Sequence, residues 1–464
     1  MRLKLTCSTV AIATLWSAAA AAQSSETFNR IATFPVASNL PSDRDPATPT
    51  VAEIVAASED GMTLVYTDSQ LKALGVVDIA DPKAPKPAGF VALEGEPTSV
   101  AVANGKALVA VVTSESNDKP SGQLVVVDIA SKAVESTCEL GGQPDAVAFN
   151  PDKSRLAVVL ENERDEELND GELPQLPSGA LAILSVDSGA ADCASMRTVD
   201  LAGLADVAGD DAEPEFADVN GAGEAVVTLQ ENNHIAIVDL AAGTVKADFS
   251  AGAADLEGID TKEDGIIRPT DKLEGVAREP DAVQWLDDER FVTANEGDYK
   301  GGSRSFTIFN RSGEVLYDSG AELEHLAMRI GHYPEGRSDA KGTEPEGLEV
   351  ATFGDDRLIF VGTERSSFVA VYRDTGAEPE YLQVLPAGLG PEGLTAIPSR
   401  SLFVVASEED LVEDGGARST LMIYERGTGD AAYPTLVSSE AEGAPIGWGA
   451  LSGLAADTAQ AGRL

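Results

Sequence analysis

Seven copies of one sequence unit run through the chain, and they constrain the fold more than any other feature. Each copy contains a short apolar run that ends in a turn rich in Asp, Asn, Gly or Ser. Examples are LGVVDIADP from Leu74, LVVVDIASK from Leu124 and IAIVDLAAG from Ile235, and the others begin at 181, 306, 369 and 421. β-Branched and aromatic residues before such a turn are typical of a strand and its exit.

A second motif, a proline with acidic or polar neighbours, precedes the apolar segments. Proline suits the first residue of a strand, where its missing N–H removes no ladder hydrogen bond. The motif occurs six times: EPTSVAV at 96, QPDAVAF at 143, EPEFADV at 213, EPDAVQW at 279, EPEGLEV at 344 and GPEGLTA at 390.

Repeats of roughly 40 to 70 residues that each hold several strands predict an all-β fold, in which neighbouring sheets bury faces that none could bury alone. We therefore predict a seven-bladed β-propeller over residues 23–430. A closed ring also removes the exposed edges of an open sheet. The strand-like run at 28–36 has no unit of its own and is expected to complete the last blade. Helical periodicity is weak outside 321–330.

The charge of the chain narrows its partners. Acidic residues number 78 against 33 basic ones, which gives a formal net charge of −45. Such a field repels nucleic-acid phosphates and anionic membrane surfaces. We therefore expect no nucleic-acid partner. Solubility alone would explain the charge, but cation binding would explain it as well.

The N-terminus has the pattern of a secretory signal. Arg2 and Lys4 precede an apolar run at 5–20, and small residues lie before Gln23. This order predicts that residues 1–22 are a signal peptide, with a periplasmic or extracellular protein as the product. No other apolar run has the length of a transmembrane helix. The mature chain keeps Cys138 and Cys193, which form either a disulfide or two free thiols.

Two series of acidic residues are expected on one face of the propeller. The first strand of a blade lies innermost, so residues that follow the prolines should surround the axis. These are Asp145, Glu215, Asp281, Glu346 and Glu392, with Thr98 in the equivalent place. The second strands run back toward the same face, and six of them end near a glutamate: Glu115, Glu163, Glu231, Glu296, Glu364 and Glu408.

Converging carboxylates cannot all stay ionised without counter-charge. Some could be protonated, some could pair with Arg278, Arg304 or Arg365, or a hard cation could bind among them. Ca²⁺, or Mg²⁺, suits a set of ligands that consists of oxygens only. Alternatively, the glutamates accept hydrogen bonds from the adjacent blade. The candidate metal ligands are Asp145, Glu163, Glu215, Glu231, Asp281, Glu296, Glu346, Glu364, Glu392 and Glu408.

Motifs for other chemistry are scarce. The three histidines lack zinc-ligand spacing, and no G-x-S-x-G nucleophile motif is present. GLGPEG matches a dinucleotide fingerprint, but a proline interrupts it and a strand is expected after it. No catalytic residue is therefore assigned.

Several segments together resemble the choice-of-anchor I family, which includes the mesenchyme-specific cell-surface glycoproteins. They are LENERDEE, LPQLPSG, TANEGDYKGGSRSFTIFN, VLYDSG and GTEPEGLEVATF, and the likeness extends over about 50–427. The resemblance implies a secreted or surface-anchored propeller, and some bacterial members are described as alkaline-phosphatase-like. Residues 447–464 resemble the opening of a phytase-like domain. Residues 431–464 are therefore expected to be a linker and the truncated start of that domain.

Two functions remain open at this point. One is a monomeric binding or scaffold propeller whose cation-stabilised acidic face recognises a small molecule or a protein. The other is a calcium-dependent phosphoesterase of alkaline-phosphatase or phytase type, in which bound cations invert the local charge and polarise a phosphate. Basic residues for that reaction would be Lys300, Arg304, Lys341 and Arg365.

Overall fold

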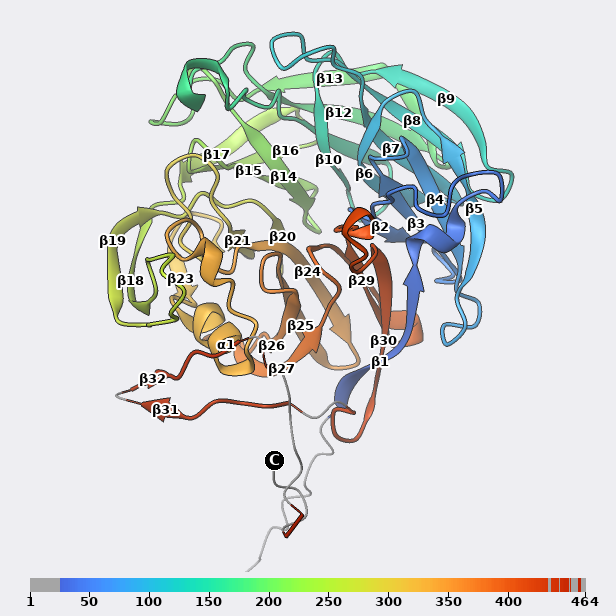
Figure 1. Cartoon of the computed structure of the whole chain (residues 1–464). Helices are drawn as coiled ribbons and strands as arrows, with labels where there is room; N and C mark the ends of the chain where they lie inside the picture. The colour runs from blue at the N-terminus through green and yellow to red at the C-terminus, as the bar shows by residue number, and fades with distance from the viewer. Residues whose placement is uncertain (1–25, 433–434, 442, 450, 452–457, 460–464) are drawn as a thin grey trace, which may run out of the picture.

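The computed structural model describes residues 26–432, 435–441, 443–449, 451 and 458–459. The predicted signal peptide, residues 1–22, lies outside these ranges. Figure 1 shows small sheets arranged as a ring around a central axis. Seven of the sheets have four antiparallel strands each, which confirms the predicted seven-bladed β-propeller.

Six blades are continuous in sequence, and their strands run from the axis outward in chain order. Blade 1 has β2 (Val55–Ala57), β3 (Thr63–Asp68), β4 (Ala73–Asp78) and β5 (Lys86–Ala92). Blade 2 has β6 (Glu96–Ala103), β7 (Lys106–Val112), β8 (Gly122–Asp128) and β9 (Ala133–Glu139). Blade 3 has β10 (Pro144–Phe149), β11 (Arg155–Leu160), β12 (Ala180–Asp187) and β13 (Ala190–Asp200). Blade 4 has β14 (Pro214–Val219), β15 (Glu224–Leu229), β16 (His234–Asp239) and β17 (Thr244–Ser250). Blade 5 has β20 (Val283–Trp285), β21 (Arg290–Asn295), β22 (Ser305–Asn310) and β23 (Val315–Asp318). Blade 6 has β24 (Pro345–Phe353), β25 (Asp356–Thr363), β26 (Phe368–Arg373) and β27 (Glu380–Pro386).

Blade 7 closes the ring with strands from both ends of the propeller. β28 (Pro391–Ile397), β29 (Leu402–Ser407) and β30 (Thr420–Thr428) pair with β1 (Glu26–Pro35) on the outside. β1 runs antiparallel to β30, from Glu26 opposite Thr428 to Pro35 opposite Thr420. The expectation that the early strand completes the last blade is thus confirmed.

The core lies between neighbouring blades. The second and third strands of each blade are buried on both faces, so their sequences are continuous apolar runs; β15 and β25 are examples. The fourth strands are more exposed, because only one of their faces is covered; in β17 exposed residues alternate with half-buried ones. Each blade therefore depends on its neighbours for burial.

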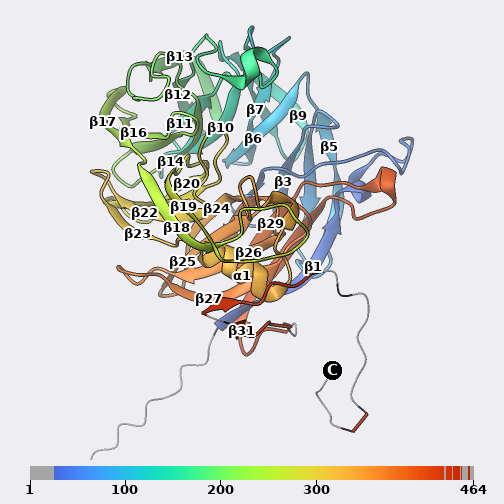
Figure 2. The ribbon, with the colours of Figure 1, turned by 60° about the vertical axis from the view of Figure 1, so that its left-hand side comes forward.

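Insertions between the strands are few. The hairpin of β18 (Ala253–Ile259) and β19 (Asp271–Ala277) follows blade 4, and α1 (Glu322–Ile330) lies between blades 5 and 6 (Figure 2). The weak helical pattern at 321–330 is therefore a helix. No helix in the described ranges is long and apolar enough to cross a membrane. Five short 3₁₀ turns complete the set: η1 (Val36–Asn39), η2 (Leu168–Gly171), η3 (Glu335–Arg337), η4 (Pro398–Arg400) and η5 (Val412–Asp414).

The described part of the C-terminal segment contacts α1. Backbone N–H of Ser438 and indole N–H of Trp448 both donate to the carbonyl of Arg329, each at 2.9 Å. The Arg329 side chain pairs with Glu440, at the start of the small hairpin of β31 (Glu440–Ala441) and β32 (Ala444–Pro445). Most of 447–464, the segment that resembles a phytase-like domain, lies outside the described residues.

Cys138 and Cys193 form a disulfide, with their Cα atoms 5.3 Å apart. Cys138 lies in β9 and Cys193 in β13, the outer strands of blades 2 and 3. Of the two alternatives that the sequence leaves open, the disulfide is therefore the correct one.

Loss of this disulfide should destabilise the propeller by about 2–4 kcal/mol, because the bond closes a loop between cysteines 55 positions apart and restricts the unfolded chain. Denaturant unfolding of the oxidised and reduced protein measures this difference. A Cys138→Ala/Cys193→Ala variant should unfold at the same denaturant concentration as the reduced protein, and reductant should not change its unfolding midpoint. Equal unfolding midpoints for the oxidised and reduced protein would contradict the prediction.

Candidate functional site

A narrow cavity of about 120 Å³ lies on the propeller axis. The residues that follow the motif prolines line it, since each innermost strand begins there. The first blade contributes Ile54 and the second Thr98. Five carboxylates complete the ring, in the places predicted from the repeats: Asp145, Glu215, Asp281, Glu346 and Glu392.

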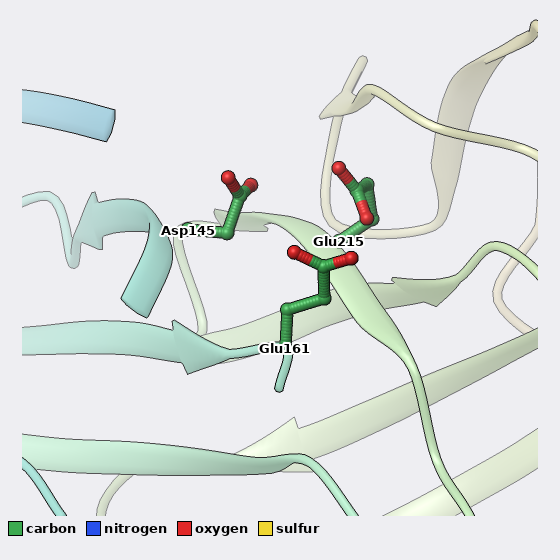
Figure 3. A group of neighbouring side chains, drawn as sticks. All are labelled: Asp145, Glu161 and Glu215. Carbon is green, nitrogen blue, oxygen red and sulfur yellow. The ribbon is translucent and has the colours of Figure 1, made fainter. Parts of the chain in front are cut away.

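A wider pocket of about 330 Å³ adjoins the ring, and Asp145 and Glu215 line both spaces. Carboxylates from the ends of the second strands join the axial ones on this side. In Figure 3, the side chains of Asp145, Glu161 and Glu215 point toward one another. We call this side of the propeller the acidic face. Four groups on it have carboxylate oxygens within 4.8 Å of one another: Asp145–Glu161–Glu215, Glu161–Glu213–Glu231, Asp281–Glu296–Glu346 and Glu296–Glu344–Glu364.

The second predicted series is brought to this face only in part. Glu231, Glu296 and Glu364 belong to the four groups. Glu408 lies near Glu392, whose pKa is raised first by burial, then by the charge of Glu53 and then by that of Glu408. Glu115 instead is exposed and pairs with Lys119 at 3.7 Å. Its blade therefore contributes no carboxylate from this series to the four groups.

Glu163 is exposed at the edge of the wider pocket, where it accepts a hydrogen bond from the side-chain amide of Gln143 at 3.1 Å. Glu161, two residues earlier, takes the inward place in two of the groups. The reason is Asn162, whose side chain accepts from the Gln143 N–H at 3.0 Å and donates to the carbonyls of Pro177 and Ser178. These bonds fix the backbone so that Glu161 faces the interior of the wider pocket.

Sequence reasoning also missed the acidic residues that precede the prolines. Glu213, Glu279 and Glu344 are 0–2% exposed, more deeply buried than the carboxylates that follow the prolines. The signal was present, because four of the six motifs, at 96, 213, 279 and 344, begin with Glu. The prediction considered only the residue after each proline, which lines the axis, and therefore left out the residue before it.

The counter-charges differ from those expected. Arg278 pairs with Asp318 at 2.9 Å, and Arg304 is buried against Glu324 at 3.3 Å, so the hypothesis that these two balance the acidic face is wrong. Arg365 does so, at 2.9 Å from Glu364. Arg164 and Lys341 also reach this face, where both pair with Asp298.

Burial and mutual repulsion shift the carboxyls toward their neutral forms. Burial raises the pKa of Asp145 to about 7, and Glu163 adds to the rise. Burial raises the pKa of Glu296 to about 7 and of Glu364 to about 8, against the opposing charges of Lys341 and Arg365. Burial and then nearby carboxylates hold the pKa well above its usual range in a further set: Glu161, Glu215, Glu231, Asp281, Glu346 and Glu392. This face therefore needs protons or cations.

The fold and this face define a class: a seven-bladed β-propeller whose axis opens onto a carboxylate-lined pocket. The choice-of-anchor I domain matches residues 53–301 and 299–377. The chain belongs to the choice-of-anchor I family, a membership consistent with a surface-associated propeller scaffold.

Solved structures support the fold alone, because their identity to this chain is low. Hydrazine synthase of Kuenenia stuttgartiensis is 13% identical over 82% of this chain and 96% of its own, with a TM-score of 0.51. The structure of U3-55K is 10% identical over 84% and 100%, with a TM-score of 0.54. Virginiamycin B lyase of Staphylococcus aureus is 10% identical over 86% and 99%, with a TM-score of 0.52. Among curated proteins, none matches this chain.

Proposed function

We propose that the protein is an exported or surface-associated scaffold that binds a small-molecule or protein ligand through the acidic face, with calcium or magnesium among the carboxylates. The observation that carries this proposal is the excess of carboxylate over cationic side chains there. Ten acidic residues form the four groups, namely Asp145, Glu161, Glu213, Glu215, Glu231, Asp281, Glu296, Glu344, Glu346 and Glu364.

Hard cations fit the donors on this face. All the ligand atoms in the four groups are carboxylate oxygens, which calcium and magnesium prefer and zinc does not. The three histidines bond elsewhere, to Asp248, to the carbonyl of Gly258 and to the carbonyl of Ser366. One oxygen of Glu346 is buried without a hydrogen-bond partner in the described structure, and a bound cation would supply that partner.

Binding is favoured over phosphoester hydrolysis because the basic residues suggested for hydrolysis are otherwise engaged. Lys300 pairs with Glu172 at 2.8 Å, and Arg304 is buried with Glu324. Lys341 and Arg365 reach the acidic face, but carboxylates already pair with both. A phosphate would have to displace these pairs before any basic group could stabilise it.

Calcium or magnesium at millimolar concentration should raise the melting temperature of the chelator-treated protein, since a ligand of the folded state stabilises it by mass action. A Glu296→Gln/Glu346→Gln variant should show a smaller rise. Without metal the variant should be no less stable than the parent, because like-charge repulsion falls. Thermal unfolding with and without each metal measures both effects.

Glu115→Gln is the matched control, because Glu115 is exposed and outside the four groups. Its response to metal should equal that of the parent. If the parent does not respond to metal, or if the double variant responds fully, these glutamates are hydrogen-bond acceptors between blades. Their loss should then simply destabilise the ring.

A further inference from the structure

Three glutamates at equivalent places have very different partners. Glu213, Glu279 and Glu344 each precede the motif proline at or shortly before the start of the innermost strand, in blades 4, 5 and 6. Their exposures are 0%, 2% and 1%. Because equally buried carboxylates need equally good partners, these positions serve as internal references for one another.

Glu279 and Glu344 have complete sets of partners. Glu279 accepts the backbone N–H groups of Asp298, Tyr299 and Lys300 at 2.8–3.0 Å. Glu344 pairs through one oxygen with Arg337 at 2.6 Å and through the other with Arg365 at 3.1 Å. In blade 5 backbone N–H groups bind the carboxylate of Glu279. In blade 6 the guanidinium groups of two arginines bind the carboxylate of Glu344.

Glu213 has neither kind of partner. Both of its oxygens are buried without a hydrogen-bond partner in the described structure, and so are one oxygen of Glu231 and one of Asp211. Carboxylate oxygens of Glu213, Glu231 and Glu161 lie within 4.8 Å of one another. Two residues with unpartnered oxygens, Glu213 and Glu231, therefore lie with Glu161 around one small space.

The nearest guanidinium cannot balance this charge. Arg164 Nε lies 3.7 Å from Glu231, and the other end of the same side chain pairs with Asp298 and Glu166. The single charge of Arg164 is thus divided among Glu231, Asp298 and Glu166, and among the described ion pairs none joins Arg164 to Glu213 or Glu161. In the corresponding group of blade 6, two arginines supply that charge to Glu344.

We infer that one calcium ion binds between Glu161, Glu213 and Glu231, off the axis and between blades 3 and 4, in the role that arginines have beside Glu344. Carboxylate oxygens within 4.8 Å of one another fit around an ion with ligand distances of about 2.4 Å. Magnesium requires shorter distances and retains several waters, which suits so buried a site poorly. This inference rests on the proposed cation binding and names one structural ion in addition to those at the axis.

A proton is the alternative occupant. Burial, followed by Glu231 and Asp211, raises the pKa of Glu213 to about 10, so that a neutral Glu213 could share its proton with Asp211. Glutamine mimics a neutral acid but offers one uncharged oxygen in place of a carboxylate, so it binds calcium more weakly. Glu213→Gln therefore separates the two occupants.

The experiment measures calcium bound per chain, after chelation and dialysis against calcium chloride, together with the melting temperature in calcium or magnesium. We expect Glu213→Gln to bind one calcium fewer than the parent and to lose much of the calcium-specific rise in melting temperature. Glu231→Gln should also bind one calcium fewer. It tests the same site with a second variant, in case Glu213→Gln does not fold. Glu279→Gln, the matched control, is equally buried but belongs to none of the four groups, so it should melt lower with or without calcium and keep the parent's calcium number.

Each other outcome has one meaning. An unchanged calcium number in both Glu213→Gln and Glu231→Gln, with fewer ions in the Glu296→Gln/Glu346→Gln variant, overturns this ion and leaves the proposed function intact. A parent that binds no calcium overturns both. A Glu279→Gln protein that also loses one ion overturns the comparison between the blades.

Discussion

Raising the pH from about 5 to 8 should destabilise the chelator-treated protein, whereas many proteins are most stable within this range. Burial raises the pKa of Glu53, Glu349 and Glu364 to about 8 in the folded state. In the unfolded chain these groups titrate near 4.3. Between the two values the folded state holds more protons, so the free energy of unfolding falls as protons are removed.

The size of the effect follows from the size of the shifts. One pKa unit corresponds to about 1.4 kcal/mol, and several groups titrate together, so the loss is on the order of several kcal/mol. The stability contributed by these neutral carboxyls is complete below about pH 4 and absent above about pH 8. Carboxylates with a lowered pKa, such as Asp374 beside Arg290, titrate below this window and do not offset the loss.

Urea unfolding at pH 5, 6, 7 and 8 in the presence of chelator measures the loss. Glu349→Gln offers a control, because Glu349 belongs to none of the four groups and glutamine cannot ionise. This variant should lose less stability than the parent over the same window. Saturating calcium should reduce the slope of the profile, since the ion replaces the protons on carboxyls of the four groups, such as Glu364. A metal-free protein whose stability rises toward pH 8 would contradict the prediction.

The fold could be predicted because its signals are local and repeated. The apolar third strand with its turn, and the proline near the first strand, can each be recognised from a few neighbouring residues. Seven repetitions made the ring the simplest way to bury them. The closure by β1 followed from one strand-like run that had no unit of its own.

On the acidic face, only the residues at a fixed position within the repeat could be predicted. Asp145 and Glu346 stand at a fixed offset from a proline, so the blade geometry places them on the axis. Glu161 replaced Glu163 because Asn162 caps the start of the neighbouring strand, a long-range contact that spacing does not reveal. Glu344 has arginine partners from η3 and from the turn between β25 and β26, whereas Glu213 has no hydrogen-bond partner among the described residues, and spacing from the proline does not distinguish the two positions.

Phe28→Ala should destabilise the ring by about 3–5 kcal/mol, as expected for removal of a large aromatic side chain from a core. Phe28 lies in β1 and is 2% exposed. Its ring contacts Phe353 and Phe360 of blade 6 and Phe403 of blade 7, with centroids 5.2, 5.4 and 6.1 Å apart. One side chain of the closing strand thus fills the seam between the last two blades.

The Phe28 backbone is held at the same seam. Its N–H donates to the side-chain oxygen of Gln383 in β27 at 2.7 Å, and its carbonyl accepts from the Gln383 amide at 3.1 Å. Without the Phe28 ring, β1 keeps these bonds and its pairing with β30 but leaves a cavity. Amide hydrogen exchange along β1 should then be faster than in blades 2 to 4, because the ring opens locally at the blade that β1 closes.

Thr33→Ala is the control, since Thr33 lies on the same strand with an exposed side chain. Its unfolding free energy should stay within about 0.5 kcal/mol of the parent. If Phe28→Ala also stays within about 1 kcal/mol of the parent, the six continuous blades carry the stability without the closing strand. A large loss with early exchange in β1 would instead make the closing strand the element that turns seven sheets into one cooperative domain.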